Sequence, residues 1–221
     1  MDIDVQKFEK YLGQSAKDPY DRYVGIICSF FSNVDGSIKT VVIETGEGVY
    51  KYFPISQIVF KDENVIVMPT WEIETRKLIN QLETAKKRIK ALDELYSKGE
   101  IAMHAYQEFK NILEKDIERL KELSREVKVM LREKMRELDK QIEDIERATA
   151  SIKLSFLAGE ISEKNFKHVM DVLKRGLDRC VAEKKDVENI YSEVEKVEKE
   201  PIVPAIPKKV EVEAPEVPAP L

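Results

Sequence analysis

The chain has 221 residues, of which 43% are hydrophobic and 36% charged, and this predicts one small domain joined to an extended assembly, excluding a large enzyme core. Its 37 basic and 42 acidic side chains nearly cancel, so no global charge favours nucleic acid or an anionic membrane. The two cysteines lack metal or disulfide spacing, and no apolar run approaches roughly 18 residues, so we expect a cytoplasmic chain that is neither exported nor membrane-spanning.

Residues 1–70 have the pattern of a small β domain. Asp4 is a candidate N-cap for a short first helix. Short β-rich runs follow, separated by turn sequences at 33–36 and 46–48. The predicted strands are 24–31, 37–45, 50–53, 58–60 and 65–68. Five or six short strands in about seventy residues indicate a strongly bent sheet or barrel, because closure hides the sheet edges.

Residues 71–198 have the periodicity of long helices. The stretch 102–156 contains neither Gly nor Pro, and its apolar residues recur three and four apart, which places a narrow apolar seam on a charged helix. Gly-Glu-Ile sequences at 99–101 and 159–161 bracket it, and Gly is favoured just past a helix C-terminus. The pattern predicts helices at about 72–97, 102–157 and 162–198, folded into an elongated antiparallel three-helix coiled coil.

Apolar residues outside the internal seam predict self-association of the rod. Val129–Leu131 and Leu154 are expected to offer apolar surface to a neighbouring copy. Replacement of Leu131 with Glu is therefore expected to weaken oligomers or filaments. The last helix has its own seam, which Lys184 is predicted to interrupt.

The tail, residues 199–221, contains six prolines and no glycine, so most of it is predicted to be disordered. The exception is the segment Lys208–Glu213, in which apolar and charged residues alternate as in a strand that could be added to the edge of a partner's sheet. From composition alone, a solvated linker is the leading interpretation of this segment. The sequence therefore leaves two interpretations, a linker and a partner-binding peptide.

A basic cluster in the first long helix raises the question of nucleic-acid binding. It consists of Lys86, Lys87, Arg88 and Lys90. These side chains are candidates for phosphate contacts, but a charge run on a coiled coil is also typical of a solvated face. Residues 1–70 hold 7 basic and 10 acidic side chains, and residues 71–198 hold 27 and 28, so neither part favours phosphate.

Other candidate sites are weaker. His104 and His168 lack the spacing of metal ligands, and we interpret them as structural. Trp71 is expected to pack locally, against Tyr52 or Pro69. No nucleophile–base pair or carboxylate cluster is present in the pattern. The sequence predicts a non-enzyme with no catalytic residues, no metal site and no cofactor.

Several motifs in the first seventy residues resemble the PRC-barrel family. They are Leu12–Gln14, Lys17–Gly25, Tyr52–Ile58 and Asn64–Pro69. One departure is Asp21, which stands where the family most often has Gly. Asp tolerates the left-handed conformation better than most residues, so we expect the turn to be kept. The resemblance implies an α+β chain that begins with a small PRC-like β-barrel.

A PRC-like barrel, a three-helix coiled coil and a Pro-rich tail, in that order, resemble the CdvA family of archaeal cell-division proteins over essentially the whole chain. The resemblance implies filaments, peripheral association with the membrane at the division site, and association with DNA. It also implies that the tail recruits the ESCRT-III homologue CdvB by pairing with a winged-helix-like domain. The implied binding residues are Ile206, Lys208, Lys209, Val210, Glu211, Val212 and Glu213.

Two functional hypotheses follow. The first is a filament-forming division scaffold that recruits an ESCRT-III homologue through its tail. The second is a nucleoid-associated DNA-binding protein, in which the barrel or the basic helix face holds duplex. Because the charges are balanced, the first hypothesis leads, and the salt dependence of any DNA affinity would separate the two.

Overall fold

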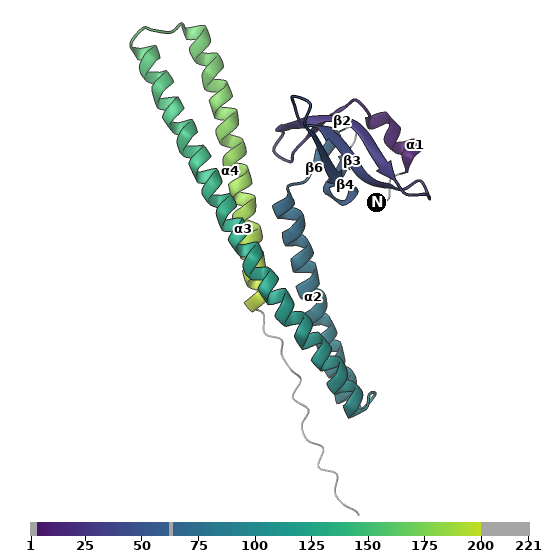
Figure 1. The fold of residues 1–221 in the computed structure, drawn as a ribbon. Coiled ribbons are helices and arrows are strands. Elements are labelled where there is room, and N and C mark those ends of the chain that lie inside the picture. Colours follow the sequence, from purple (N-terminus) through teal and green to yellow (C-terminus); the bar gives the residue numbers. More distant parts are fainter. Residues whose placement is uncertain (1–3, 62–63, 200–221) are drawn as a thin grey trace, which may run out of the picture.

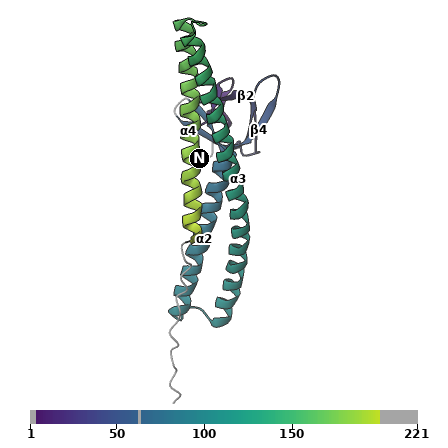
Figure 2. The ribbon, with the colours of Figure 1, turned by 90° about the vertical axis from the view of Figure 1, so that its left-hand side faces the viewer.

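The computed structural model describes residues 4–61 and 64–199. A mixed six-stranded sheet at the N-terminus is followed by three long packed helices, so the predicted α+β fold is confirmed. Figure 1 shows the sheet unit lying beside the middle of a helical rod, next to the start of α2. Figure 2, turned by 90°, shows the three helices running along one common direction.

The sheet unit begins with two short helical segments, α1 (Val5–Phe8) and η1 (Glu9–Tyr11). The strands are β1 (Ser15–Lys17), β2 (Tyr23–Ser32), β3 (Ile38–Glu44), β4 (Tyr50–Pro54), β5 (Ile58–Lys61) and β6 (Asn64–Val67), with η2 (Ile55–Gln57) between β4 and β5. Their order is β4-β3-β2-β1-β6-β5, and only the β1–β6 ladder is parallel. All five predicted strands are present, and β1 is an additional one.

The first helix closes the core of the sheet unit. The carboxylate of Asp4 accepts a hydrogen bond from the backbone N–H of Lys7 at 2.8 Å, which confirms the predicted N-cap. Phe8 is fully buried and makes edge-to-face contacts with Phe30 and Phe60, at 5.3 and 5.9 Å between ring centroids. The aromatic cluster therefore joins the helix to β2 in the interior of the sheet and to β5 at one of its edges.

The structure shows why the PRC-like motif Lys17–Gly25 has Asp at position 21 and Gly at position 25. Asp21 has φ 61°, so the left-handed turn is kept with Asp in place of Gly, as predicted. Asp18 supports this turn, because its carboxylate accepts from the backbone N–H groups of Tyr20 and Arg22. Gly25 is required for another reason, since a Cβ there would lie 2.2 Å from the carbonyl oxygen of Glu44 on β3.

The rod consists of α2 (Thr70–Ser97), α3 (Met103–Leu157) and α4 (Glu163–Lys199). Both predicted corners are confirmed, with Gly99 at φ 72° and Gly159 at φ 76°. At the first corner the N–H of Gly99 donates to Tyr96 and that of Glu100 to Leu95, the two hydrogen bonds of a Schellman motif, and the second corner repeats them. The chain therefore reverses direction twice.

The long α3 helix has different partners along its length. Its first half packs against α2 and its second half against α4, and the three helices overlap in the middle of the rod (Figures 1 and 2). One apolar cluster runs through the overlap. Its buried members include Trp71, Leu78, Leu82, Leu120, Val127, Leu131, Leu138, Val187, Ile190 and Val194. The predicted antiparallel arrangement is thus confirmed.

Two details of the seam differ from the prediction. Leu131 has 0% of its surface exposed and belongs to the internal cluster, so its proposed role in contacts between copies is wrong. The charged residue that interrupts the α4 seam is Glu183, which is buried, and not Lys184. The ammonium group of Lys184 instead lies at the helix surface, 2.6 Å from the carboxylate of Asp139 on α3.

Candidate functional site

The predicted partner-binding residues, Ile206 and Lys208–Glu213, lie outside the described residues, so that site stays a prediction. The structure does describe where the tail is attached. Helix α4 ends at Lys199 against α2, and the ammonium group of Lys86 donates to the backbone carbonyl of Val197. The tail therefore starts beside the middle of α2, on the surface of the rod.

The four residues of the basic cluster do not share one face. Lys86 is directed to the end of α4, whereas Lys87 pairs with Glu83 on its own helix at 3.5 Å. Arg88 points to the opposite side, toward α3, and Lys90 is exposed. Because successive helical residues lie about 100° apart, a run of four cations is spread around the helix. The proposed phosphate contact by these residues stays a prediction.

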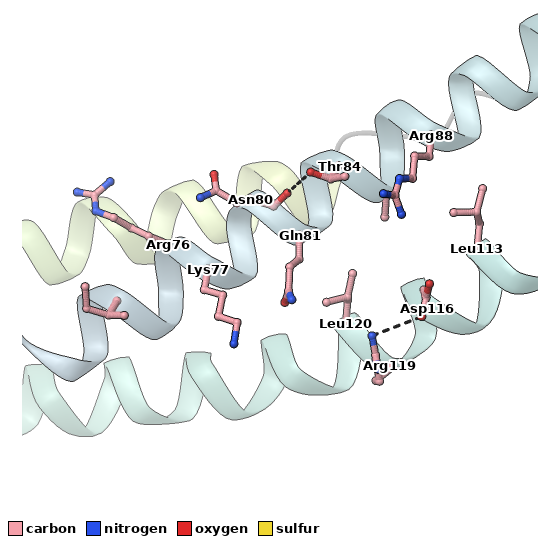
Figure 3. A pocket seen from close by; sticks show the side chains of 12 residues that line it. Arg76, Lys77, Asn80, Gln81, Thr84, Arg88, Leu113, Asp116, Arg119 and Leu120 are labelled. Atoms are coloured by element: carbon pink, nitrogen blue, oxygen red, sulfur yellow. Dashed lines mark hydrogen bonds and ion pairs between the residues drawn. The ribbon is translucent and has the colours of Figure 1, made fainter. Parts of the chain in front are cut away.

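Arg88 instead lines a groove whose lining residues all come from α2 and α3. The groove has a volume of about 540 Å³, and Lys77, Gln81 and Arg88 extend from α2 toward Leu120 and Arg119 of α3 (Figure 3). Arg119 pairs with Asp116 at 3.4 Å. Neither Lys77 nor Arg88 has an ion-pair partner within the two described stretches of the chain. The groove therefore combines an apolar floor with two uncompensated cations.

The sheet unit is joined to the rod at Glu183, whose side chain is only 3% exposed. One of its carboxylate oxygens accepts from the guanidinium of Arg22 at 2.5 Å. The other lies 3.4 Å from both the indole N–H of Trp71 and the ammonium group of Lys134. One buried carboxylate thus contacts side chains from the sheet unit, α2 and α3.

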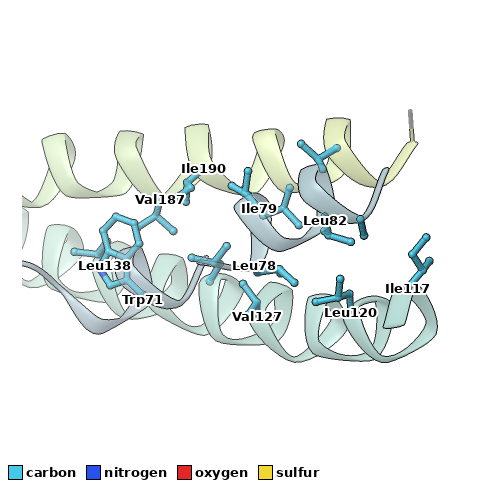
Figure 4. Packing of buried hydrophobic residues seen from close by; sticks show 14 of the residues in the cluster. Trp71, Leu78, Ile79, Leu82, Ile117, Leu120, Val127, Leu138, Val187 and Ile190 are labelled. Carbon is cyan, nitrogen blue, oxygen red and sulfur yellow. The ribbon is translucent and has the colours of Figure 1, made fainter. Parts of the chain in front are cut away.

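Trp71 does not pack where the sequence suggested. Its ring is buried beside Leu138 of α3 and Val187 of α4 (Figure 4). One of the two expected neighbours, Tyr52, lies on β4 and is exposed, and the ring is instead part of the helical core. The reason is that the first turn of α2 enters the three-helix core directly, where the indole N–H lies 3.4 Å from a carboxylate oxygen of the buried Glu183.

Two further contacts between the sheet unit and α4 surround the buried carboxylate. The hydroxyl of Tyr20 donates to the carboxylate of Asp186 at 3.1 Å, and the guanidinium of Arg179 donates to the backbone carbonyl of Asp21 at 2.9 Å. Burial, and then the nearby Asp186 carboxylate, raises the pKa of Tyr20. These bonds fix the turn before β2 against one face of α4.

Sequence reasoning missed this junction. The available signal was Glu183, an acidic residue at a position of the α4 repeat where the neighbouring seam residues, Cys180 and Val187, are apolar. A buried carboxylate requires cations or donors nearby. The sequence alone did not show that Arg22, 161 positions earlier, supplies one of them.

Two apolar surfaces are exposed. On the outer face of the sheet, Phe31 stacks on Tyr52 with 6.1 Å between ring centroids, beside exposed Tyr50. On the rod, Val129 and Leu154 have 50% and 70% of their surface exposed, which confirms that both are available to a neighbour. Exposed aromatic residues that lie together, as on the sheet, are typical of protein–protein interfaces, whereas Val129 and Leu154 are separate positions about 37 Å apart along α3.

Residues 4–61 and 64–199 contain no group of three or more His, Cys, Asp or Glu side chains arranged to hold a metal ion. His104 and His168 are both exposed. None of the described helices is long and apolar enough to cross a membrane.

Comparison with known proteins gives two matches. A family model described as a CdvA-like coiled-coil domain matches residues 70–216, which include all three long helices and the predicted strand in the tail. Cell division protein A of Sulfolobus acidocaldarius is 30% identical over 202 residues, covering 91% of this chain and 84% of that protein. No solved structure matches the chain.

Proposed function

The chain belongs to the CdvA family of archaeal cell-division proteins, and on that premise we propose that it is a non-enzymatic, filament-forming scaffold that recruits the ESCRT-III homologue CdvB through its C-terminal tail. The observation that carries the proposal is that the family match continues past the end of α4 to residue 216, so it includes Lys208–Glu213. The proposal divides the chain into a sheet unit (1–70), a rod (71–198) and a partner-binding tail (199–221).

The rod suits a scaffold because it is long and exposes most of its surface. Its core is one narrow seam shared by three helices, and its exposed apolar residues lie on the outside. Such a rod presents the same surfaces at regular intervals when copies associate. We propose that the outer sheet face and the rod surface around Val129 and Leu154 make these contacts, at the membrane of the division site.

Recruitment is proposed to occur by addition of Lys208–Glu213 as a strand to a sheet of CdvB. Side chains alternate along a strand, so Val210 and Val212 would enter pockets of the partner while Lys209 and Glu211 face solvent. Main-chain hydrogen bonds between the added strand and CdvB would contribute to affinity independently of the side chains. This arrangement needs no contact between CdvB and the rod.

A pull-down of CdvB by a peptide of residues 199–221 tests the recruitment step. Capture of CdvB by this peptide, and its loss from a chain that ends at Pro207, are the expected results. The shortened chain should still form filaments. Equal capture of CdvB by the full chain and by the chain that ends at Pro207 would contradict the proposal, because it would place the contact elsewhere.

The groove between α2 and α3 favours DNA binding as the second candidate function. It brings Lys77 and Arg88 together with Arg76 and Arg119, although the chain as a whole carries a net charge of −5. If the groove bound duplex, the affinity would fall steeply as salt rises, and Lys77→Glu with Arg88→Glu would abolish it. If the unmodified chain bound DNA only weakly and the double variant bound it equally well, a DNA-binding role of the groove would be excluded.

A further inference from the structure

Helix α4 occupies a furrow between α2 and α3, and this furrow extends beyond the end of α4. Up to its last turn it lies on α2 and α3, with Val194 and Val197 buried. Figures 1 and 2 show α2 and α3 continuing past the end of α4 as a two-helix pair, as far as the corner at Gly99. The seat of the third helix therefore continues along the rod beyond Lys199.

This continuation contains a cavity of about 330 Å³. Ile89 of α2 and Ile117 of α3 form its apolar floor, and both belong to the core cluster of the three-helix region. Asp93, Lys110 and Glu114 line its sides. The cavity is thus a direct extension of an established helix interface, and its floor has the same apolar character.

Asp93, in the wall of this cavity, has one carboxylate oxygen without a partner among the described residues. Its residue surface is only 5% exposed. One carboxylate oxygen, Oδ1, accepts from the hydroxyl of Tyr106 at 2.9 Å, whereas Oδ2 is buried and has no hydrogen-bond partner in residues 4–61 and 64–199. The ammonium group of Lys110 is bonded to the Tyr106 hydroxyl at 3.4 Å. A buried acceptor without a donor is costly, so this site requires one.

We propose that residues 200–207 of the same chain occupy this groove and that the backbone N–H of Ile202 or Val203 donates to Oδ2 of Asp93. The segment starts where the groove starts, because Val197 lies level with Lys86. Asp93 lies about 10 Å farther along α2, and an extended Pro-rich chain covers that distance in about three or four residues. Ile202 and Val203 therefore reach the level of Asp93.

The composition of the segment fits the groove. Its sequence, Glu-Pro-Ile-Val-Pro-Ala-Ile-Pro, contains three large apolar residues and one charged residue, a composition suited to covering an apolar floor. Pro201 and Pro204 have no N–H to leave unpaired, and Pro201 does not allow α4 to continue as a regular helix. The family match also runs through this segment to residue 216.

The inference does not rest on the proposed function, but it changes how the tail is presented. If residues 200–207 are seated, the chain leaves the rod near the Gly99 corner, and the following residues are displayed from that end. The seated segment would then act as an anchor and Lys208–Glu213 as the presented peptide, so Ile206 would contact the rod and not the partner. Partner binding and anchoring are therefore separable by experiment.

A nitroxide label at Val203 tests the seat directly. The label is attached to Val203→Cys in a Cys28→Ser background, because Cys28 is exposed whereas Cys180 is buried. The spectrum should show slow motion at Val203 and fast motion in the control, Val217→Cys. Replacement of Ile202 by Asp should release the label. Equally fast motion at both sites would overturn the inference, and so would slow motion that disappears on dilution, because it would indicate a second copy in the groove.

Amide exchange of shortened chains gives an independent readout. A chain that ends at Lys199 should exchange at least about tenfold faster than a chain that ends at Pro207 over residues 89–93 and 110–117. Both chains lack Lys208–Glu213, so neither result depends on CdvB. Equal exchange in the two chains would overturn the inference even if the tail peptide binds CdvB.

Discussion

Arg22, in the turn before β2, donates to Glu183 of α4 at 2.5 Å between the guanidinium nitrogen and the carboxylate oxygen. This bond joins the sheet unit to the part of the rod where α2, α3 and α4 overlap. Because Glu183 also contacts Trp71 and Lys134, one side chain couples the position of the sheet unit to the packing of three helices.

Replacement of Glu183 with Ala should destabilise the protein by about 2–4 kcal/mol, because it leaves Arg22 and Lys134 partly buried without their acidic partner. The free energy of unfolding in urea measures this. The matched control is Glu188→Ala on the same helix, an exposed residue 3.8 Å from Lys184, which should change stability by less than about 0.5 kcal/mol. Equal effects of the two substitutions would contradict the role of the junction.

The hydrogen bond from Tyr20 to Asp186 predicts a loss of stability at high pH. The pKa of Tyr20 is raised above its ordinary value of 10.0, so the folded protein keeps a proton that the unfolded chain releases. The stabilisation of the folded protein by the protonated Tyr20 hydroxyl is therefore complete below about pH 10 and is lost as the pH rises above that value. Thermal unfolding at pH 8 and pH 11 should show this loss, and Tyr20→Phe should reduce it. An unchanged difference in Tyr20→Phe would count against the assignment.

Two glycines of the rod should respond to alanine in opposite directions. Gly159 has φ 76° at the corner, so Gly159→Ala should destabilise by about 1–2 kcal/mol. Gly176 lies within α4, where an added Cβ would meet Ile145 at an ordinary 3.5 Å. Gly176→Ala should therefore stabilise by about 0.5–1 kcal/mol, because alanine favours helix. Calorimetric melting of both variants checks the prediction, and a shift in the same direction would refute it.

Self-association should depend on exposed and not on internal apolar residues. Leu154→Glu and Val129→Glu are expected to reduce the size of oligomers at micromolar concentration while the helical content stays unchanged. Leu131→Glu should instead unfold the rod, because it places a charge in the core. Light scattering with circular dichroism separates these effects. Monomers of the unmodified chain over the whole concentration range would contradict the scaffold proposal.

Local signals in the sequence were enough to predict most of the fold. The corners at Gly99 and Gly159 follow from the repeated Gly-Glu-Ile, and the N-cap at Asp4 follows from its side chain. Strand β1 was missed because Ser-Ala-Lys shows no apolar alternation, and it is held by pairing with β2 and β6. Its position is decided by neighbours distant in sequence.

The sites were less predictable than the fold. Periodicity assigns a residue to a helix face but does not say which helix covers that face, so Leu131 was placed outside and is inside. The same limit applies to Trp71, whose partners on α3 and α4 lie far along the chain. The unpaired oxygen of Asp93 could not be predicted either, because periodicity does not say which donors reach a buried carboxylate.

The most direct test of the account is the affinity of the full chain for CdvB, measured by titration calorimetry. Burial of a valine contributes at most about 1.5–3 kcal/mol, and about 1.4 kcal/mol corresponds to a tenfold change in affinity. The double variant Val210→Asp, Val212→Asp should therefore bind at least about a hundredfold more weakly, whereas Glu211→Ala should stay within about twofold of the unmodified chain. Unchanged binding of the double variant would show that Lys208–Glu213 is not the contact and would contradict the proposed mode of recruitment.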